Sequence, residues 1–413
     1  MDTLATTRAD CLALDAADPL GAARDAFELP PDVVYLDGNS LGPPPRLARE
    51  RMQAVLEREW GVGLVRSWND AGWIEAPLRV GAKIARLIGA APGEVVVADS
   101  TTVNIFKLLS AALALRPGRR VIVMREGDFP TDGYVAGGLA AMTGAELRCV
   151  AATELEGAVE ADVAAFCVTH VDYRTGEMLD MHGLTAAAHR VGALAMWDLC
   201  HSAGAVPLDV TAADVDLAVG CGYKYLNGGP GAPAFCMVAT RHHERLQQPL
   251  WGWMGHAAPF AFEPGYRPGA GITRMLSGTP PMVAIAALEA GVDAWLGIDM
   301  SAVRAKSLAL ADLCMTLVAQ RCSGLGIEVV TPRDPERRGA QVSLRFADAY
   351  PLCRALIARG VIGDFRPPDI LRLGLTPLYL RYVDIYDAVE AIREVLTSAV
   401  WRRPEYAVRT VVT

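Results

Sequence analysis

The chain lacks the sequence features of a membrane protein, of a disulfide-stabilised protein and of a metal site. No apolar run reaches the ~18 residues of a membrane-spanning helix, and residues 1–15 show no signal-peptide pattern. The nine cysteines are scattered, odd in number and without a C-x-x-C pair, and the histidines have no metal-ligand spacing. We therefore expect a cytoplasmic protein in a reducing compartment, without a metal ion.

The chain also lacks an excess of positive charge. Its 39 lysines and arginines are outnumbered by 47 aspartates and glutamates, which gives a formal net charge of -8. No basic field is present to attract nucleic acid or an anionic membrane. The expected partner is a small molecule.

What the chain does contain is a long alternation of short apolar runs with helical patterns. This order predicts an α/β fold in which a mainly parallel sheet is covered on both faces. In such sheets, ligands bind beyond the carboxyl ends of the strands. The candidate strands are 94–97, 120–124, 146–150, 164–168, 193–197 and 215–219.

The pattern changes along the 413 residues and predicts three segments. Residues 1–45 form an N-terminal arm that joins the small domain, residues 46–290 form the large domain, and residues 291–413 form a smaller α+β domain.

The stretch 222–231 follows the last candidate strand and reads Gly-Tyr-Lys-Tyr-Leu-Asn-Gly-Gly-Pro-Gly. An unpaired ammonium is costly to bury, so Lys224 at a strand end needs a partner and is a candidate amine nucleophile. A P-loop is excluded, because in that motif the lysine follows the glycines. The alternative is that Lys224 reaches solvent and that the glycines form an ordinary turn.

Other strand ends carry the groups that a flat, phosphorylated cofactor needs. Thr101 and Thr102 precede a helical run, where they either cap the helix or help to bind a phosphate. Phe129 is either a core residue or a ring that stacks on a heterocycle. Asp198 ends the apolar run 193–197, where it either caps the next helix or pairs with a cation, and His201 lies three residues later.

Together with Lys224, these side chains match the needs of pyridoxal phosphate. Its aldehyde condenses with a lysine, its ring nitrogen pairs with a carboxylate, and its phosphate binds a helix N-terminus. Arg372, at a later strand position, offers a fork that could bind a substrate carboxylate bidentately, with a surface salt bridge as the alternative. Trp68 is either a packing anchor or the aromatic wall of a ligand site.

Seven motifs, spread over most of the chain, form a specific set. They are Tyr-Leu-Asp-Gly-Asn-Ser-Leu-Gly at 35–42, Arg-Ser-Trp-Asn at 66–69, Phe-Pro-Thr-Asp at 129–132, Trp-Asp-Leu-Cys-His-Ser-Ala-Gly at 197–204, the lysine stretch at 223–231, Gly-Trp-Met-Gly-His at 252–256 and Thr-Pro-Leu-Tyr at 376–379. With these motifs the sequence resembles the bacterial kynureninase family. The resemblance implies the aspartate aminotransferase-like fold of pyridoxal-phosphate-dependent transferases, with a mainly parallel seven-stranded sheet in the large domain. It also implies hydrolytic cleavage of L-kynurenine to anthranilate and L-alanine in tryptophan catabolism.

The resemblance further implies roles for single residues. Lys224 would hold the cofactor covalently and move the substrate α-proton, Asp198 would pair with the pyridinium nitrogen, and Tyr223 would reach the phosphate and aid proton transfer. Arg372 would hold the substrate α-carboxylate. The other implied cofactor contacts are Thr101, Thr102, Phe129, Asp132, Thr169, His201, Trp253 and Thr279.

The implied assembly is a homodimer, in which Trp253 and Thr279 would arrive from the other subunit. Trp68, Gly278 and Thr279 would line the pocket for the aryl ring. Animal members that prefer 3-hydroxykynurenine carry histidine and asparagine at the first and last of these positions. Because Trp68 and Thr279 offer no such polar partners, we expect L-kynurenine as the preferred substrate and 3-hydroxykynurenine as a weaker one.

Two alternatives to this resemblance remain at the level of sequence. The first is a cysteine desulfurase or a small-substrate aminotransferase. Desulfurases place a histidine before the lysine, whereas Tyr223 precedes Lys224 here. The second is a catalytically silent binding protein on the same scaffold, which would normally have lost Lys224 or Asp198.

Overall fold

The computed structural model describes residues 7–410, so residues 1–6 of the predicted N-terminal arm lie outside the described part. The chain divides into two compact units. Of the described residues, unit 1 contains 7–46, the short segment Tyr173–Met178 and 297–410. Unit 2 contains Leu47–Asp172 and Leu179–Leu296.

The predicted boundary between the large and the small domain, 290/291, falls inside helix α8 (Met282–Asp293). All of α8 belongs to unit 2, and the boundary between the two units lies at 296/297. Arg79 and Lys83 of helix α4 (Ala76–Ile88) give the physical reason, because both pair with Glu289 of α8 at 2.9 Å. A helical run in the sequence does not reveal such a partner.

Unit 2 is built on a seven-stranded sheet in the order β2-β8-β7-β6-β5-β3-β4. The neighbours from β7 to β4 run parallel, whereas β8 lies antiparallel between β2 and β7. This confirms the predicted α/β fold with a mainly parallel sheet; β8 was not among the candidate strands. The strands are β2 (Val95–Val97), β3 (Val121–Arg125), β4 (Glu146–Val150), β5 (Val163–Thr169), β6 (Leu194–Asp198), β7 (Leu217–Gly220) and β8 (Phe235–Val238).

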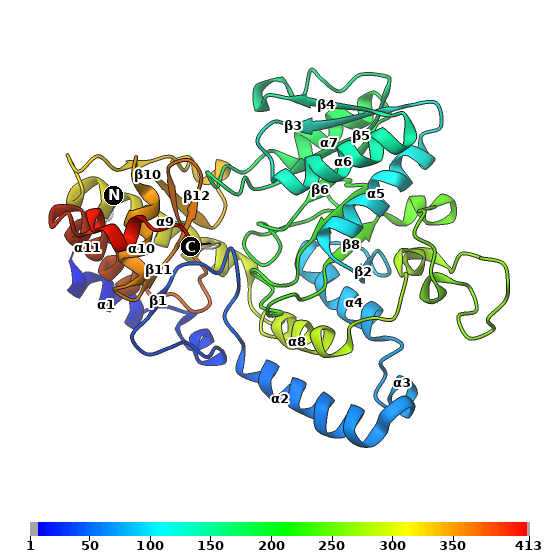
Figure 1. Cartoon of the computed structure of the whole chain (residues 1–413), viewed down its shortest axis with the longest axis horizontal. Coiled ribbons are helices and arrows are strands. Elements are labelled where there is room, and N and C mark those ends of the chain that lie inside the picture. The colour runs from blue at the N-terminus through cyan, green and yellow to red at the C-terminus, as the bar shows by residue number, and fades with distance from the viewer. Residues whose placement is uncertain (1–6, 411–413) are drawn as a thin grey trace. The chain divides into compact units, whose positions relative to one another are not determined.

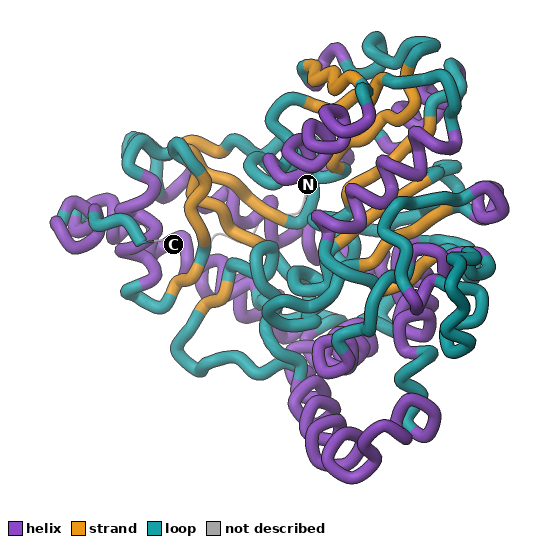
Figure 2. Tube along the Cα trace, turned by 45° about the vertical axis from the view of Figure 1, so that its right-hand side comes forward, coloured by secondary structure: helices purple, strands orange, loops and turns teal. Residues whose placement is uncertain are grey.

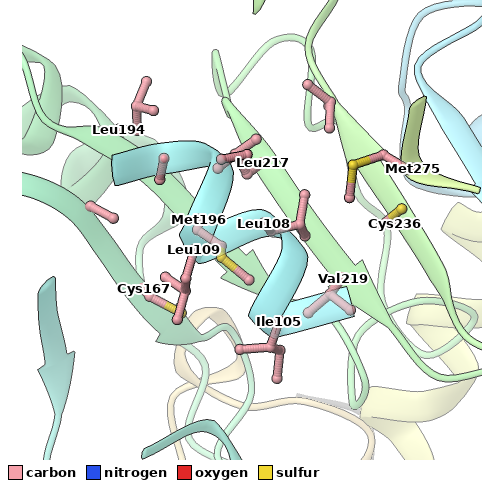
Figure 3. Packing of buried hydrophobic residues seen from close by; sticks show 14 of the residues in the cluster. Ile105, Leu108, Leu109, Cys167, Leu194, Met196, Leu217, Val219, Cys236 and Met275 are labelled. Atoms are coloured by element: carbon pink, nitrogen blue, oxygen red, sulfur yellow. The ribbon is translucent and has the colours of Figure 1, made fainter. Parts of the chain in front are cut away.

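Helices lie alongside these strands (Figure 2). Ile105, Leu108 and Leu109 of α5 are fully buried and pack with side chains of β5, β6, β7 and β8 (Figure 3). Helix α5 therefore has a fixed place on the sheet. Besides α4 and α8, the helices of this unit are α2 (Arg46–Ala54, its first residue in unit 1), α3 (Ser67–Asp70), α5 (Thr101–Leu115), α6 (Pro130–Thr143) and α7 (Met181–Arg190).

Unit 1 joins the N-terminal segment to the C-terminal part of the chain (Figure 1). Its strand β1 (Val34–Tyr35) pairs in parallel with β11 (Val361–Ile362). The second sheet is antiparallel and has the order β12-β13-β10-β9. The remaining elements are α1 (Arg8–Ala16), α9 (Met300–Arg321), β9 (Glu328–Val329), β10 (Gln341–Arg345), α10 (Ala349–Ile357), β12 (Asp364–Arg366), β13 (Ile370–Gly374), α11 (Tyr382–Thr397) and α12 (Pro404–Ala407). Within residues 7–410, no helix has the length and apolar character needed to cross a membrane.

A buried carboxylate, Asp216, lies directly before β7 and binds several neighbouring groups. It accepts hydrogen bonds from His189, His242 and Arg241, each at 2.7 Å, and from the backbone N–H of Ala195 at 2.8 Å. Burial alone would raise the pKa of Asp216, but the bonds from His189 and His242 outweigh it and hold this pKa well below its usual range. The ionised form of Asp216 therefore stabilises the folded state.

We predict that Asp216→Asn lowers the free energy of unfolding by about 3 kcal/mol at pH 7, because removing one partner leaves buried donors without their charge. Since the pKa of Asp216 is depressed in the folded state, this contribution is present above about pH 4 and is lost as the pH falls further. Urea denaturation at a series of pH values measures the difference. Asp214→Asn is the matched control, because Asp214 is exposed, and we expect a change of about 0.5 kcal/mol or less there. Equal effects of the two substitutions would contradict the prediction.

Candidate active site

Lys224 lies in the tight turn that follows β7. Gly222 permits this turn, because a Cβ there would lie 2.4 Å from the carbonyl oxygen of Pro233. The N–H of Gly228 closes the turn by donating to the carbonyl of Gly222 at 2.8 Å. The half-buried Lys224 is therefore presented by a backbone that admits few alternatives.

The Lys224 ammonium is surrounded by the side chains that the sequence predicted. Its Nζ lies 2.9 Å from Nε2 of His201 and 5.9 Å from the ring centroids of both Phe129 and Tyr223. Phe129 precedes α6 and remains 43% exposed, so an aromatic face borders the lysine. Burial raises the pKa of Tyr223, which keeps its hydroxyl protonated at neutral pH.

Asp198 and Thr169 end the neighbouring parallel strands β6 and β5, where they are register partners. Both are buried, and one oxygen of Asp198 accepts the N–H of Cys200 at 2.7 Å. The hydroxyl of Thr169 is buried without a hydrogen-bond partner among residues 7–410. An unpaired buried hydroxyl is costly, and a ligand at this place would satisfy it.

A cluster of buried carboxyls surrounds Asp198. Burial raises the pKa of Asp128 to about 7, although its Oδ2 accepts the N–H of Thr169 at 3.0 Å. Burial and the charge of Asp198 raise the pKa of Asp132 well above its usual value. Asp128 was not among the predicted site residues; its position three residues after the end of β3 was the available signal. Three buried acids fit a ligand that brings a positive charge, as a protonated pyridine nitrogen does.

Helix α5 begins at Thr101, close to the Asp198 turn, since Oγ1 of Thr101 lies 3.8 Å from Sγ of Cys200. Ser100 is the N-cap, and its hydroxyl accepts the N–H of Val103 at 3.3 Å. The first N–H groups of a helix have no acceptor within the helix. Those of Thr101 and Thr102, together with the positive end of the helix dipole, fit a phosphate group. The buried cluster and this helix start together fit pyridoxal phosphate.

Trp68 belongs to an aromatic cluster of unit 2. Its ring centroid lies 5.8 Å from that of Trp73 and 6.5 Å from that of Trp253, both in edge-to-face geometry. Helix α2 ends at Ala54, and the chain continues directly as a π-helix (Val55–Gly63). Glu59 of that π-helix accepts the indole N–H of Trp73 at 2.7 Å. Gly278 and Thr279 are exposed on this chain.

Arg372, in unit 1, is buried at 1% exposure, so the alternative of a surface salt bridge is wrong. Its Nε donates to Oδ1 of Asp364 at 2.8 Å and its Nη2 bonds Oδ2 of the same carboxylate. Nη2 also donates to the hydroxyl of Ser40, and Nη1 donates to the carbonyl of Tyr173 at 2.7 Å. Within residues 7–410, these four bonds leave one of the five guanidinium N–H groups uncommitted. Asp364 therefore already occupies the fork that the sequence offered to a substrate carboxylate.

Unit 2 also has a cavity of about 550 Å³ that none of the predicted site residues lines. Its walls come from α5, α6 and the segment 247–251, with Phe106, Met142 and Trp251 among them. The position of this cavity therefore does not coincide with the candidate site at Lys224.

Comparisons with known proteins identify the family and the fold of this chain. Residues 303–392 match the family described as kynureninase C-terminal domain. Kynureninase from Burkholderia pseudomallei strain K96243 is 51% identical over 414 residues, which cover 98% of this chain and 100% of that protein. Kynureninase from Pseudomonas fluorescens is 51% identical over 415 residues, which cover 99% of this chain and 100% of the relative.

The solved structures with a similar fold are more distant in sequence. The cysteine desulfurase CsdA from Escherichia coli has a TM-score of 0.77 at 20% identity and covers 92% of this chain and 98% of its own. The enzyme C-DES, solved with glycine covalently linked to its pyridoxal-phosphate cofactor, has a TM-score of 0.77 at 15% identity, covering 88% of this chain and 97% of its own. These likenesses confirm that the chain has the fold of pyridoxal-phosphate enzymes. Several families share this fold, and the 51% identity to kynureninases shows which of them this chain is part of. The chain belongs to the kynureninase family.

Proposed function

We propose that the protein is a pyridoxal-phosphate-dependent hydrolase that cleaves L-kynurenine to anthranilate and L-alanine. The observation that carries the proposal is the position of Lys224 beside His201, Phe129 and Tyr223, at the same sheet edge as the buried carboxyl of Asp198. Kinship with kynureninases over nearly the whole chain supports the substrate. We place the reaction in the cytoplasm.

The cofactor would be held by groups from several strand ends. Lys224 would bind it covalently, Asp198 would accept its ring N–H, and Phe129 would lie on its face. The remaining contacts would come from Thr101, Thr102, Asp132, Thr169, His201 and Tyr223. When bound, pyridoxal phosphate supplies an electron sink for the substrate α-carbon. The buried acids around Asp198 favour the protonated ring nitrogen, which that sink requires.

Lys224 and Tyr223 would handle the protons of the reaction. The Lys224 amine would take the α-proton, and its contact with His201 at 2.9 Å orients it and offers a second proton carrier. Tyr223 keeps its proton at neutral pH and would donate it to the phosphate or toward the substrate carbonyl, to which water adds.

Arg372 would bind the substrate α-carboxylate with its remaining N–H and with its charge. The bonds that the guanidinium donates to Asp364 and Ser40 hold it in one orientation, which spares the entropy of ordering it when the substrate binds. We further propose a homodimer in which Trp253 and Thr279 of one chain serve the site of the other. Because Trp68 packs near Trp253 on the same chain, the aryl pocket would receive both rings together.

We predict that Lys224→Ala abolishes the visible absorbance of the lysine-bound cofactor and lowers turnover by about a thousandfold or more, since the nucleophile and a proton carrier are lost. The measurement is release of anthranilate and alanine from L-kynurenine, with absorbance spectra of the loaded protein. Lys83→Ala is the control, because Lys83 lies in α4 and pairs with Glu289 and Asp293. Wild-type protein that releases no alanine from either kynurenine substrate would refute the proposed function, and sulfur release from L-cysteine would favour the desulfurase alternative.

We predict that Trp68→His raises the ratio of kcat/KM for 3-hydroxy-L-kynurenine over L-kynurenine by about tenfold, because an imidazole can satisfy the ring hydroxyl that tryptophan leaves without a partner. The two rates are compared for the wild type, the variant and Trp68→Phe. The phenylalanine variant keeps an apolar wall and should keep the wild-type preference. An unchanged ratio in Trp68→His would remove Trp68 from the aryl pocket.

A further inference from the structure

One charged side chain of unit 2 is fully buried and has no role in the chemistry proposed above. Lys107 lies in the middle of α5, among the apolar residues that pack on the sheet, and its side chain is 0% exposed. Its Nζ donates to a carboxylate oxygen of Asp99 and to the carbonyl of Met275 at 2.7 Å. A buried ion pair often stabilises a fold no better than apolar side chains of similar volume. The positions of Asp99 and Met275 indicate a further role for this ion pair.

Asp99 forms the turn between the end of β2 and the start of α5, and its backbone is in the left-handed region, with φ +47°. A residue other than glycine in this region costs about 1–3 kcal/mol and persists only where the surroundings enforce it. A backbone hydrogen bond fixes one side of the turn, because the carbonyl of Asp99 accepts the N–H of Ala234 at 2.9 Å. The ammonium of Lys107 holds the other side through the Asp99 side chain.

The turn sets the direction of the helix start. Thr101 follows Asp99 by two residues, and its N–H and that of Thr102 are the groups proposed to bind the cofactor phosphate. Hydrogen bonds weaken steeply when the donor is misdirected. A turn that relaxed to an ordinary backbone conformation would aim these two N–H groups elsewhere.

The second partner of Lys107 extends the effect to another loop. Met275 is buried in the core next to α5 (Figure 3) and stands two residues before Ser277. The carbonyl of Ser277 accepts the N–H of Met254 at 3.1 Å. Lys107 thus links the helix start to the segments that carry Trp253 and Thr279.

We propose that Lys107 is a positioning residue for the cofactor phosphate, acting through Asp99 to aim the first N–H groups of α5. The inference rests on the proposed assignment of this helix start to the phosphate. Lys107 itself touches neither cofactor nor substrate in this scheme. Its loss should weaken cofactor binding first, and turnover at saturating cofactor much less.

The test is titration of apo-protein with pyridoxal phosphate, followed by quenching of tryptophan fluorescence and by the phosphorus NMR signal of the bound phosphate. We predict that Lys107→Met weakens binding by about tenfold and shifts the phosphorus signal, since two charge-assisted hydrogen bonds are misdirected. Lys83→Met, which removes a partly buried lysine of unit 2 from its acids, should change Kd by less than about twofold.

Two variants of Asp99 keep the test decisive if Lys107→Met does not fold. Asp99→Ala removes the acceptor and should weaken binding as Lys107→Met does. Asp99→Asn retains an acceptor and tolerates the left-handed backbone, so its Kd should stay near that of the wild type. Lower thermal stability with an unchanged Kd and phosphorus signal in Lys107→Met and Asp99→Ala would overturn the inference. Wild-type protein that binds no pyridoxal phosphate would instead refute the proposed function.

Discussion

The constraint on which the site depends is a group of carboxyl groups buried at and just beyond the carboxyl ends of parallel strands, where their ionised forms are costly. Asp128, Asp132 and Asp198 lie in a low-dielectric environment, where burial raises the pKa of the first two. Such a cluster is unfavourable by itself. A cofactor with a protonated ring nitrogen relieves it and is in turn kept protonated by it. The electron sink of the proposed reaction thus originates in the electrostatics of the protein.

Positive groups surround this cluster in an ordered way. Lys224 approaches from the turn after β7, and the positive end of α5 lies at the start of that helix near Cys200. Lys107 does not face the cluster, yet it holds the strained turn at Asp99 from which α5 begins. The half-buried Lys224 supplies the proposed nucleophilic amine, whereas the fully buried ammonium of Lys107 fixes backbone geometry.

In unit 1 the buried charged group is a guanidinium, which likewise needs partners for its polar atoms. Arg372 is buried because Asp364, Ser40 and Tyr173 satisfy its donors. These partners come from three distant parts of the chain, and β12 and β13 place Asp364 directly opposite Arg372. An arginine so fixed has little freedom left to lose on binding a carboxylate.

Patterns in the sequence were sufficient to predict the α/β class, most strands of the large sheet and the lysine, aspartate and phenylalanine at its edge. Parallel strands place their carboxyl ends together, so apolar runs followed by polar residues identify such an edge. The seven motifs likewise pointed to the kynureninase family, which the 51% identity confirms. Four features are visible only in the folded chain: Asp364 occupies the fork of Arg372, Lys107 bonds Asp99, the helix after Ala54 is a π-helix, and Asp128 is buried. Each of these features depends on burial or on contacts outside the local pattern. The periodicity of a single segment carries no information about such contacts.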